Sequence, residues 1–296
     1  MAQVPRAVFV HRQSALQQLI NRHGTYNQGS FFLSNKGLSA KSMVAQNDTV
    51  QDALALAGAS VPPHWRRGTV ERGDLDRFLF DEHDVVVVVG QDGLVANVAK
   101  YLDGQPVIGV NADPGNTGVL TRHGPDAVER LLHRVEAGTA QCELRTMAEA
   151  RTDDGRTLTA LNEVFLGHPS HQTARYRLAT PDGRTERQAS SGVLVGTGTG
   201  STGWCGSVQR ERPGAPRLPG PTQDQLVWFV REAWPSPTTG TDLTQGTLDG
   251  AATLSLTVES EGLVAFGDGI EADRLVLSWG ERVDIGPAGK RLRLVV

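Results

Sequence analysis

The sequence predicts an α/β domain followed by a β-rich domain, and three observations support this prediction. The chain has 296 residues, which is more than one ordinary hydrophobic core needs. Up to about Gly138, strand and helix patterns alternate, which is typical of a parallel sheet with helices on both faces. After Gly138, short strands separated by turn signals replace the helical spacing, so we expect the second domain to be a β-sandwich.

The first domain starts with a strand and a helix whose ends are marked. "RAVFVH" (6–11) has the composition of a strand, and "SALQQLINRHG" predicts a helix that opens on Ser14 and stops at Gly24. The run "DVVVVVG" (84–90) is β-branched throughout, which is typical of a strand covered on both faces. The other predicted elements are helices at 49–59, 94–102 and 124–138 and a strand at 106–112.

Turn signals organise the second domain. Asp153-Asp154-Gly155 and Pro181-Asp182-Gly183 each lie between two short strand patterns, which predicts two hairpins. "RERPGAPRLPGPTQ" (210–223) contains too much proline and glycine for a helix or a strand, so we expect a long loop there.

Composition excludes several classes of protein. A net charge of −4 does not suit general binding of nucleic acid. No segment approaches the ~18 apolar residues of a membrane span, and we find no amphipathic basic surface helix that would reach a membrane. Cys142 and Cys205 form no spaced framework and suit a reducing cytosol. We therefore expect a cytoplasmic protein with neither nucleic-acid nor membrane partners.

The first candidate site is Gly90-Gln91-Asp92-Gly93, where the predicted valine strand ends and a helix begins. Ligands of open α/β sheets bind beyond the carboxyl ends of the strands, and small residues there let phosphate approach backbone N–H groups. An aspartate would repel phosphate, so Asp92 suggests a proton acceptor or a carboxylate beside a metal ion. The alternative is a tight strand-to-helix turn with Asp92 as the N-cap.

Two further segments carry polar groups in unusual places. Asn162-Glu163 interrupts the apolar strand "TALNEVFLG", and such a pair needs partners: the amide and the carboxylate can bond a ribose. The strand at 192–195 leads into a turn of glycine and hydroxyl residues, Thr197 to Gly203, which supplies donors for phosphate and ribose. A pair at a strand end facing solvent and a plain glycine-rich hairpin are the alternatives.

These three segments resemble the motifs of the NAD kinases. That family carries a G-G-D-G-T loop, then an N-E pair on a strand, then a T-P-T-G-S-T-A-Y turn, in the order seen here. "PVIGVNADP" (106–114) and "AFGDGIEA" (265–272) are similar to two further family segments. The details "ALNEVFLG", "SSG", "TGTGS" and Trp204 are most similar to the mitochondrial-type branch and its bacterial relatives.

The resemblance implies a fold, a reaction and a set of site residues. The fold would be a Rossmann-like parallel α/β nucleotide-binding domain (1–138), a β-sandwich domain (139–273) and a C-terminal segment (274–296) that packs back on the first domain. The reaction would be phosphorylation of the adenosine 2′-hydroxyl of NAD by ATP with Mg²⁺, giving NADP, in a homo-oligomer (dimer or tetramer). Asp92 would be the catalytic base. The residues with implied binding roles are Gly90, Gln91, Gly93, Asn162, Glu163, Thr197, Thr199, Gly200, Ser201, Thr202 and Trp204.

The chain departs from the family pattern on the phosphate-donor side. Gln91 replaces the second glycine of the loop, where a Cβ would cost on the order of 1 kcal/mol if the position needed positive φ. Leu94 replaces the loop threonine, which removes one hydroxyl donor. Two alternatives therefore stay open: a kinase of another nucleotide or hydroxylated small molecule, and a non-catalytic NAD(P)-binding protein. His168 and His171 have no partners at ligand spacing, so we expect no metal held by the protein.

Overall fold

The computed structural model describes residues 4–113, 115 and 118–296. The chain forms two compact units: the first is Met1–Glu143 together with Arg293–Val296, and the second is Leu144–Leu292. Pro114 of the segment "PVIGVNADP" lies outside the described residues. Among the described residues, no helix is long and apolar enough to cross a membrane.

A parallel sheet is the centre of the first unit. Its strands β1 (Arg6–His11), β2 (Arg66–Glu71), β3 (Asp84–Gly90) and β4 (Pro106–Asn111) run in the order β2-β1-β3-β4. All of these pairs are parallel, and Arg293, in the last strand of the chain, pairs in parallel with β4. The sequence thus predicts the parallel sheet correctly, although it misses β2, whose charged residues hide its pattern.

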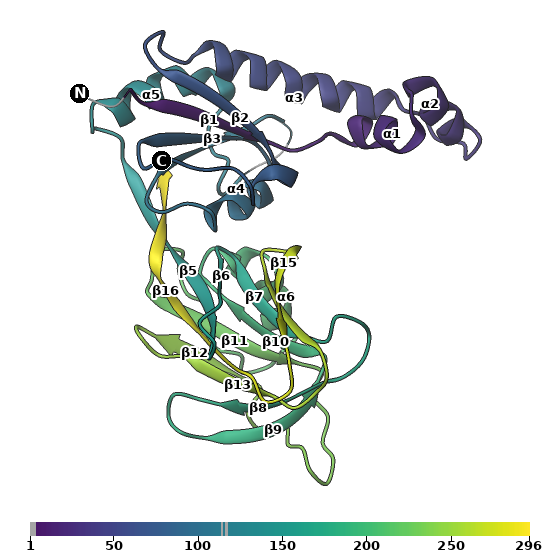
Figure 1. Ribbon diagram of the computed structural model, residues 1–296, viewed down its shortest axis with the longest axis vertical. Helices are drawn as coiled ribbons and strands as arrows, with labels where there is room; N and C mark the ends of the chain where they lie inside the picture. Colours follow the sequence, from purple (N-terminus) through teal and green to yellow (C-terminus); the bar gives the residue numbers. More distant parts are fainter. Residues whose placement is uncertain (1–3, 114, 116–117) are drawn as a thin grey trace. The chain divides into compact units, whose positions relative to one another are not determined.

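Helices cover both faces of this sheet (Figure 1). The helices are α1 (Ala15–His23), α2 (Tyr26–Ser34), α3 (Lys41–Ala59), α4 (Asp92–Ala99) and α5 (Val128–Glu136). Val85, Val87 and Val89 share one core cluster with residues of α3 and α5, whereas α4 lies on the opposite face. Strand β3 is therefore buried on both sides, as its run of valines predicts.

The predicted ends of the first helix are confirmed. Ser14 is the N-cap of α1 and forms a capping box with Gln17, and Gly24 ends the helix with φ 86°. Helix α2 was not predicted, because its stretch contains a glycine and little apolar periodicity. That glycine is required: a Cβ on Gly29 would lie 2.7 Å from Leu19 Cγ of the neighbouring helix.

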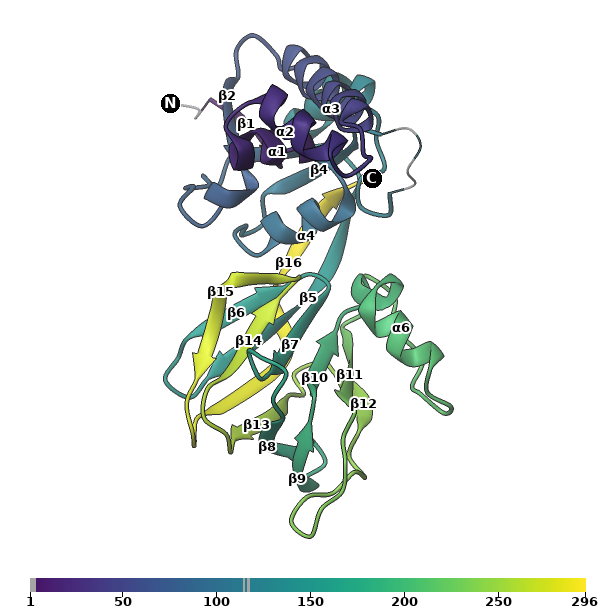
Figure 2. The same ribbon diagram turned by 90° about the vertical axis from the view of Figure 1, so that its right-hand side faces the viewer.

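The second unit is a sandwich of two antiparallel sheets (Figure 2). One sheet has the order β12-β11-β10-β7-β14-β15, and the other contains β16-β13-β8-β9, with β5 and β6 beside it. Inward side chains of both sheets, such as Val164 and Val195 on one and Leu178 and Leu256 on the other, form one core cluster. The strands are β5 (Cys142–Thr152), β6 (Thr157–Ala160), β7 (Glu163–Gly167), β8 (Ala174–Ala179), β9 (Thr185–Ser190), β10 (Gly192–Gly196), β11 (Gln225–Arg231), β12 (Gln245–Asp249), β13 (Leu254–Val258), β14 (Leu263–Gly267), β15 (Ile270–Leu277) and β16 (Arg282–Val295).

Two segments of the second unit bear on the predicted boundaries. Helix α6 (Trp204–Arg210) is followed by 211–224, where the structure has neither helix nor strand, so the predicted long loop is confirmed from residue 211 onward. Of the predicted return segment 274–296, Arg293–Val296 group with the first unit. Strand β15 instead pairs with β14, and the first part of β16 pairs with β13.

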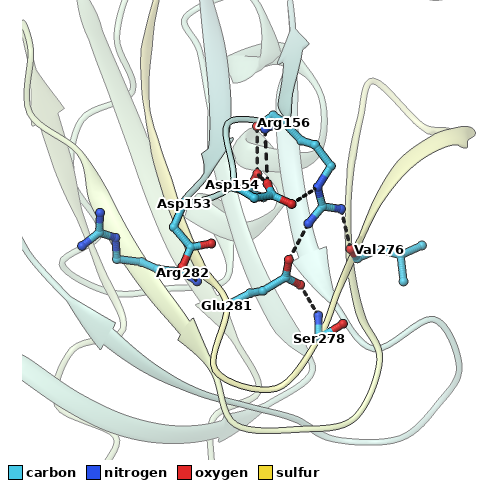
Figure 3. A network of polar contacts seen from close by, with 8 residues as sticks. Asp153, Asp154, Arg156, Val276, Ser278, Glu281 and Arg282 are labelled. Atoms are coloured by element: carbon cyan, nitrogen blue, oxygen red, sulfur yellow. Dashed lines mark hydrogen bonds and ion pairs between the residues drawn. The ribbon is translucent and has the colours of Figure 1, made fainter.

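The two predicted hairpin turns share the pattern T-x-D-G-R and the same local bonds. In Thr152–Arg156 and in Thr180–Arg184, the threonine hydroxyl donates to the aspartate, whose other oxygen accepts from the arginine Nε at 2.7 Å. In the first turn the arginine makes further contacts outside the turn (Figure 3). There, Arg156 also donates to the Val276 carbonyl at 2.9 Å and pairs with Glu281 at 2.5 Å.

Candidate functional site

Asp92 lies in the first turn of α4, at the carboxyl end of β3. The N-cap of this helix is Gln91, so the alternative interpretation of Asp92 as the N-cap is wrong. The carboxylate of Asp92 instead accepts hydrogen bonds from a neighbouring loop. The backbone N–H of Val119 donates to Oδ2 at 2.7 Å, and the N–H groups of Leu120 and Thr121 donate to Oδ1 at 3.0 and 2.9 Å. The Thr121 hydroxyl also donates to Oδ1, at 2.8 Å.

These bonds determine the ionisation state of Asp92 and how many further hydrogen bonds its carboxylate can accept. Burial would raise the pKa of Asp92, but the hydrogen bonds from Thr121, Val119 and Leu120 together outweigh it and hold the pKa below its usual value. The group is therefore an ionised acceptor at neutral pH. A carboxylate has about four lone-pair positions. Oδ1 accepts three donors and Oδ2 accepts one, so Oδ2 is the oxygen that can take a further donor.

The residues around Asp92 differ in whether their backbone conformation and surroundings allow a side chain. Gln91 has φ −104° and ψ 162°, an ordinary extended conformation, so its Cβ carries none of the backbone penalty that positive φ would impose. Gly90 has φ 155°, which side-chain-bearing residues rarely adopt. A Cβ on Gly93 would meet no atom within 4 Å, so this position is open. Leu94 is buried and packs near Gly90, so it serves the core of the first unit.

Glu163, the first residue of β7, lies beside a second carboxyl group. Asp268, in the turn between β14 and β15, has φ 54°, and its N–H donates to the Glu163 carbonyl at 3.1 Å. Burial, and secondly the charge of Asp268, raise the pKa of Glu163 to about 7. Glu163 can therefore carry a proton near neutral pH, when it can donate as well as accept.

Asp268 also fixes the neighbouring backbone. Its carboxylate accepts from the N–H groups of Leu161 and Asn162 at 2.8 and 2.6 Å. The carbonyl of Asn162 in turn accepts from the N–H of Thr197 at 2.9 Å. The structure thus brings together the Asn162-Glu163 pair, the start of the glycine-rich turn and Asp268. No role for Asp268 was predicted from the sequence, where its place in the segment "AFGDGIEA" was the only signal.

The turn from Thr197 to Gly203 packs tightly against this backbone. A Cβ on Gly200 would lie 2.3 Å from the Asn162 carbonyl oxygen, and one on Gly198 would lie 1.9 Å from that of Gly220. The Thr197 hydroxyl donates to the Leu161 carbonyl and accepts from the N–H of Thr199 and Gly200. These glycines are therefore required for close packing of backbone on backbone.

The hydroxyl residues of the turn differ in exposure. Thr197 and Thr199 are buried, whereas Ser201 is half-buried and Thr202 is exposed. The hydroxyls of Ser201 and Thr202 donate to the carbonyls of Thr197 and Thr199, at 3.3 and 3.5 Å. Of these four hydroxyl residues, Thr202 is thus the most accessible to a ligand. The hydroxyl of Thr197 instead stabilises the backbone of the turn through its hydrogen bonds.

Trp204 follows the turn and begins α6. Its ring stacks on Phe165 with centroids 5.4 Å apart, and the Arg231 guanidinium lies 5.0 Å from its centroid. Part of the predicted stacking surface is therefore occupied within the protein. Cys205 beside it is buried, and burial, followed by the nearby Glu163, raises the pKa of its thiol to about 12. This thiol is not a nucleophile at neutral pH.

Arg145 of β5 is a neighbour of the turn that the sequence did not indicate. Its side chain is buried, and Nη1 donates to the Thr199 hydroxyl at 3.4 Å. The signal in the sequence was a charged residue inside a predicted strand, because a buried charge needs hydrogen-bond partners.

The predicted residues form two groups. Gly90, Gln91, Asp92 and Gly93 belong to the first unit, and Asn162, Glu163 and the segment 197–204 belong to the second. Over the described part of the chain, no three His, Cys, Asp or Glu residues are placed to hold a metal ion.

Comparisons with known proteins find similarity to the NAD kinases. The family model described as the ATP-NAD kinase N-terminal domain matches residues 8–140. An NAD kinase of Chlorobaculum tepidum is 27% identical over 45% of this chain and 46% of its own length. NAD kinase 2, mitochondrial, of Rattus norvegicus is 31% identical over 48% of this chain and 44% of its own length. An NAD kinase of Halorubrum lacusprofundi is 33% identical over 54% of this chain and 62% of its own length.

The chain spans about half the length of the curated relatives it matches. The matched region includes the loop with Asp92, and the parallel sheet and sandwich agree with the architecture that the motifs imply. Residues 8–140 are thus similar to the N-terminal domain of the NAD kinases, and the chain is similar to curated NAD kinases over about half of its length.

Proposed function

We propose that this protein transfers a phosphoryl group from ATP to the adenosine 2′-hydroxyl of NAD, giving NADP. The observation that carries the proposal is Asp92: an ionised carboxylate at the carboxyl end of a parallel sheet, with one oxygen that can accept a further donor. This is the position at which open α/β sheets bind ligands. The similarity to the NAD kinases supports the substrate pair.

The proposed chemistry needs a proton acceptor and positioned phosphates. A ribose hydroxyl is a poor nucleophile at neutral pH, so Oδ2 of Asp92 would accept the 2′-hydroxyl proton as the oxygen–phosphorus bond forms. The bond between the γ-phosphorus and its bridging oxygen breaks, and ADP leaves. Gly93, where the structure has open space, would let the backbone N–H groups at the start of α4 approach the phosphates.

The second unit would hold NAD. Glu163, with a pKa of about 7, can donate to or accept from a ribose hydroxyl, and Asn162 offers a donor and an acceptor beside it. Thr202 and the accessible part of Trp204 would contact the nucleotide. We assign Gly200 and Thr197 to the shape of this pocket, since both pack on the Asn162 backbone.

Mg²⁺ fits the proposed site as a companion of ATP. Mg²⁺ is usually bound by phosphate oxygens together with one or two carboxylates. Bound there, it would neutralise charge on the phosphates.

We further propose a homo-oligomer (dimer or tetramer) in the cytoplasm, with 1–138 as the nucleotide-binding domain and 139–273 as the sandwich domain. The family resemblance supports the assembly. Two unpaired cysteines, Cys142 and Cys205, agree with a reducing compartment. Light scattering after gel filtration and fractionation of cells test these two points.

The test of the activity is direct. The protein is incubated with NAD, ATP and Mg²⁺, and the product is identified by mass and by reduction with an NADP-specific dehydrogenase. We expect NADP to form and ADP to appear in equal amount. Binding of NAD without any product from ATP, other nucleoside triphosphates or polyphosphate would overturn the proposal.

A further inference from the structure

The helix pair α1–α2 and the start of α3 carry an unusual surface. From Arg12 to Asn47, the sequence has four basic residues and no acidic residue. The whole chain has a net charge of −4, so the remainder carries −8. A positive segment in an acidic protein marks a place where a negatively charged partner is attracted.

The basic side chains of this segment are accessible. They are Arg12, Arg22, Lys36 and Lys41, and all four are exposed. The ion pairs among the described residues include none of them. Their charge is therefore available to a partner.

Large apolar side chains are exposed beside these charges. Phe31 is 67% and Leu38 is 59% exposed, and Tyr26 and Phe32 are also exposed. The ring of Phe32 lies 4.5 Å from Lys36 Nζ and has its centroid 4.5 Å from that of His23. Apolar and basic groups thus lie next to one another rather than on separate faces.

The backbone holds these groups in place. Helix α2 ends at Ser34, and Gly37, with φ 72°, lies in the turn that follows. The N–H of Leu38 donates to the Leu33 carbonyl at 2.9 Å, which folds the chain back on the helix. Leu33 and Gly29 face inward, and Phe31 faces outward. Helices α1 and α2 lie at the end of α3 that points away from the sheet (Figure 1). The exposed apolar side chains are therefore held on the outer surface by ordered backbone and are not part of the hydrophobic core.

We propose that this surface, formed by α1, α2 and the first turn of α3, binds an anionic lipid bilayer. Exposed aromatic and aliphatic side chains enter the interfacial layer of a membrane, while neighbouring Lys and Arg side chains contact its headgroups. The exposed basic side chains are not held in fixed pairs, which suits a fluid array of headgroups better than the fixed geometry of an acidic protein partner. We expected no membrane partner because the sequence has no continuous amphipathic basic helix, whereas the surface proposed here is built from two short helices and a loop.

The test uses the full chain and two kinds of vesicle. Vesicles of phosphatidylcholine alone are compared with vesicles of phosphatidylcholine and phosphatidylglycerol in flotation. We expect binding to the anionic vesicles and much weaker binding at about 0.5 M salt, since the salt screens the charges. No binding to either vesicle would overturn the proposal.

Matched variants locate the surface. Phe31→Ser with Leu38→Ser should lower vesicle partition by about ten-fold or more, and Lys36→Glu with Lys41→Glu should lower it by about five-fold per residue or more. The control is Leu79→Ser with Trp279→Ser, which removes side chains 87% and 66% exposed elsewhere and should leave partition unchanged. Thermal melting and NAD binding must stay at wild-type values in all three.

Three outcomes would contradict the proposal. The control could lose partition as fully as the Phe31/Leu38 variant, which would indicate non-specific adsorption. Wild type could bind polyglutamate but not anionic vesicles, which would indicate an acidic protein partner. It could also form an oligomer that Phe31→Ser with Leu38→Ser dissociates, without vesicle binding, which would make the surface a contact between copies of this chain.

Discussion

Asp92 and Glu163 are partly buried carboxyl groups, one in each unit, and their pKa values move in opposite directions. Burial acts to raise both. At Asp92, four hydrogen bonds from Val119, Leu120 and Thr121 reverse that effect, whereas at Glu163 the neighbouring Asp268 adds to it. The partners of a buried acid, rather than its depth, therefore decide whether it is an ionised acceptor or a group that holds a proton at neutral pH.

The largest effect should come from removing the ionised acceptor. Asp92→Asn should lower kcat by about 10²–10⁴-fold, because the amide cannot take the ribose proton. NAD affinity should stay nearly unchanged, since the groups proposed to bind NAD lie in the second unit. Stopped-flow kinetics and calorimetry separate the two quantities. Wild-type turnover in this variant would remove Asp92 from the chemistry.

Glu163 should matter for binding more than for turnover. Glu163→Ala should weaken NAD binding by roughly 1–3 kcal/mol, because ribose hydroxyls lose their partner in a closed site. Calorimetric titration of NAD measures this directly, with Glu259→Ala, a carboxyl paired with Arg177 and Arg187, as a control that should leave affinity unchanged. Unchanged affinity of the Glu163 variant would place this residue outside the site.

The raised pKa of Glu163 predicts a dependence of stability on pH. The folded state binds this proton more tightly than the unfolded state, so the stabilisation is complete below pH ~4.5, falls as pH rises and is lost above pH ~7. Glu163→Gln should remove this component and be more stable than wild type above pH 7, by on the order of 3 kcal/mol. Urea unfolding from pH 5 to 8 measures it.

Asp268→Asn refines the same measurement. The change removes the second cause of the shift, so the pKa of Glu163 should fall but remain above 4.5, because burial is the larger cause. Carbon NMR of the Glu163 carboxyl follows the titration. If the pKa does not move, Asp268 does not act on Glu163 through its charge.

The smallest effect should come from Gln91. Because its backbone conformation is ordinary, Gln91→Gly should change kcat and KM for ATP by only a few-fold. Leu94→Thr is the contrast: it replaces a buried side chain and should destabilise the fold by about 1–3 kcal/mol. A large gain of activity with Gln91→Gly would show that the glutamine obstructs the phosphates. Steady-state kinetics and urea unfolding measure the two effects.

The sequence predicted local features well because local physics determines them. The β-branched run at 84–90 predicted a buried central strand, and Ser14 and Gly24 predicted the two ends of a helix; the structure has both. Contacts between distant segments were not predictable. The pairing of Asp268 with Glu163 needs strand β14 to lie beside β7, and the donors to Asp92 come from a loop that no motif marks. The strand β2 and the helix α2 were missed because neither has a clear apolar period.

The two T-x-D-G-R turns offer a practical consequence for handling the protein. In the turn Thr180–Arg184, the arginine bonds to the aspartate of its own turn. In the turn Thr152–Arg156, Arg156 also forms an ion pair with Glu281, which connects the hairpin to a second turn (Figure 3). A short peptide tag inserted after Gly183 should therefore leave the melting temperature near the wild-type value, and the same tag after Gly155 should lower it. Of these two turns of nearly the same sequence, the first connects two segments of the fold, and the second is the better site for inserting labels, surface tethers and fluorescent probes.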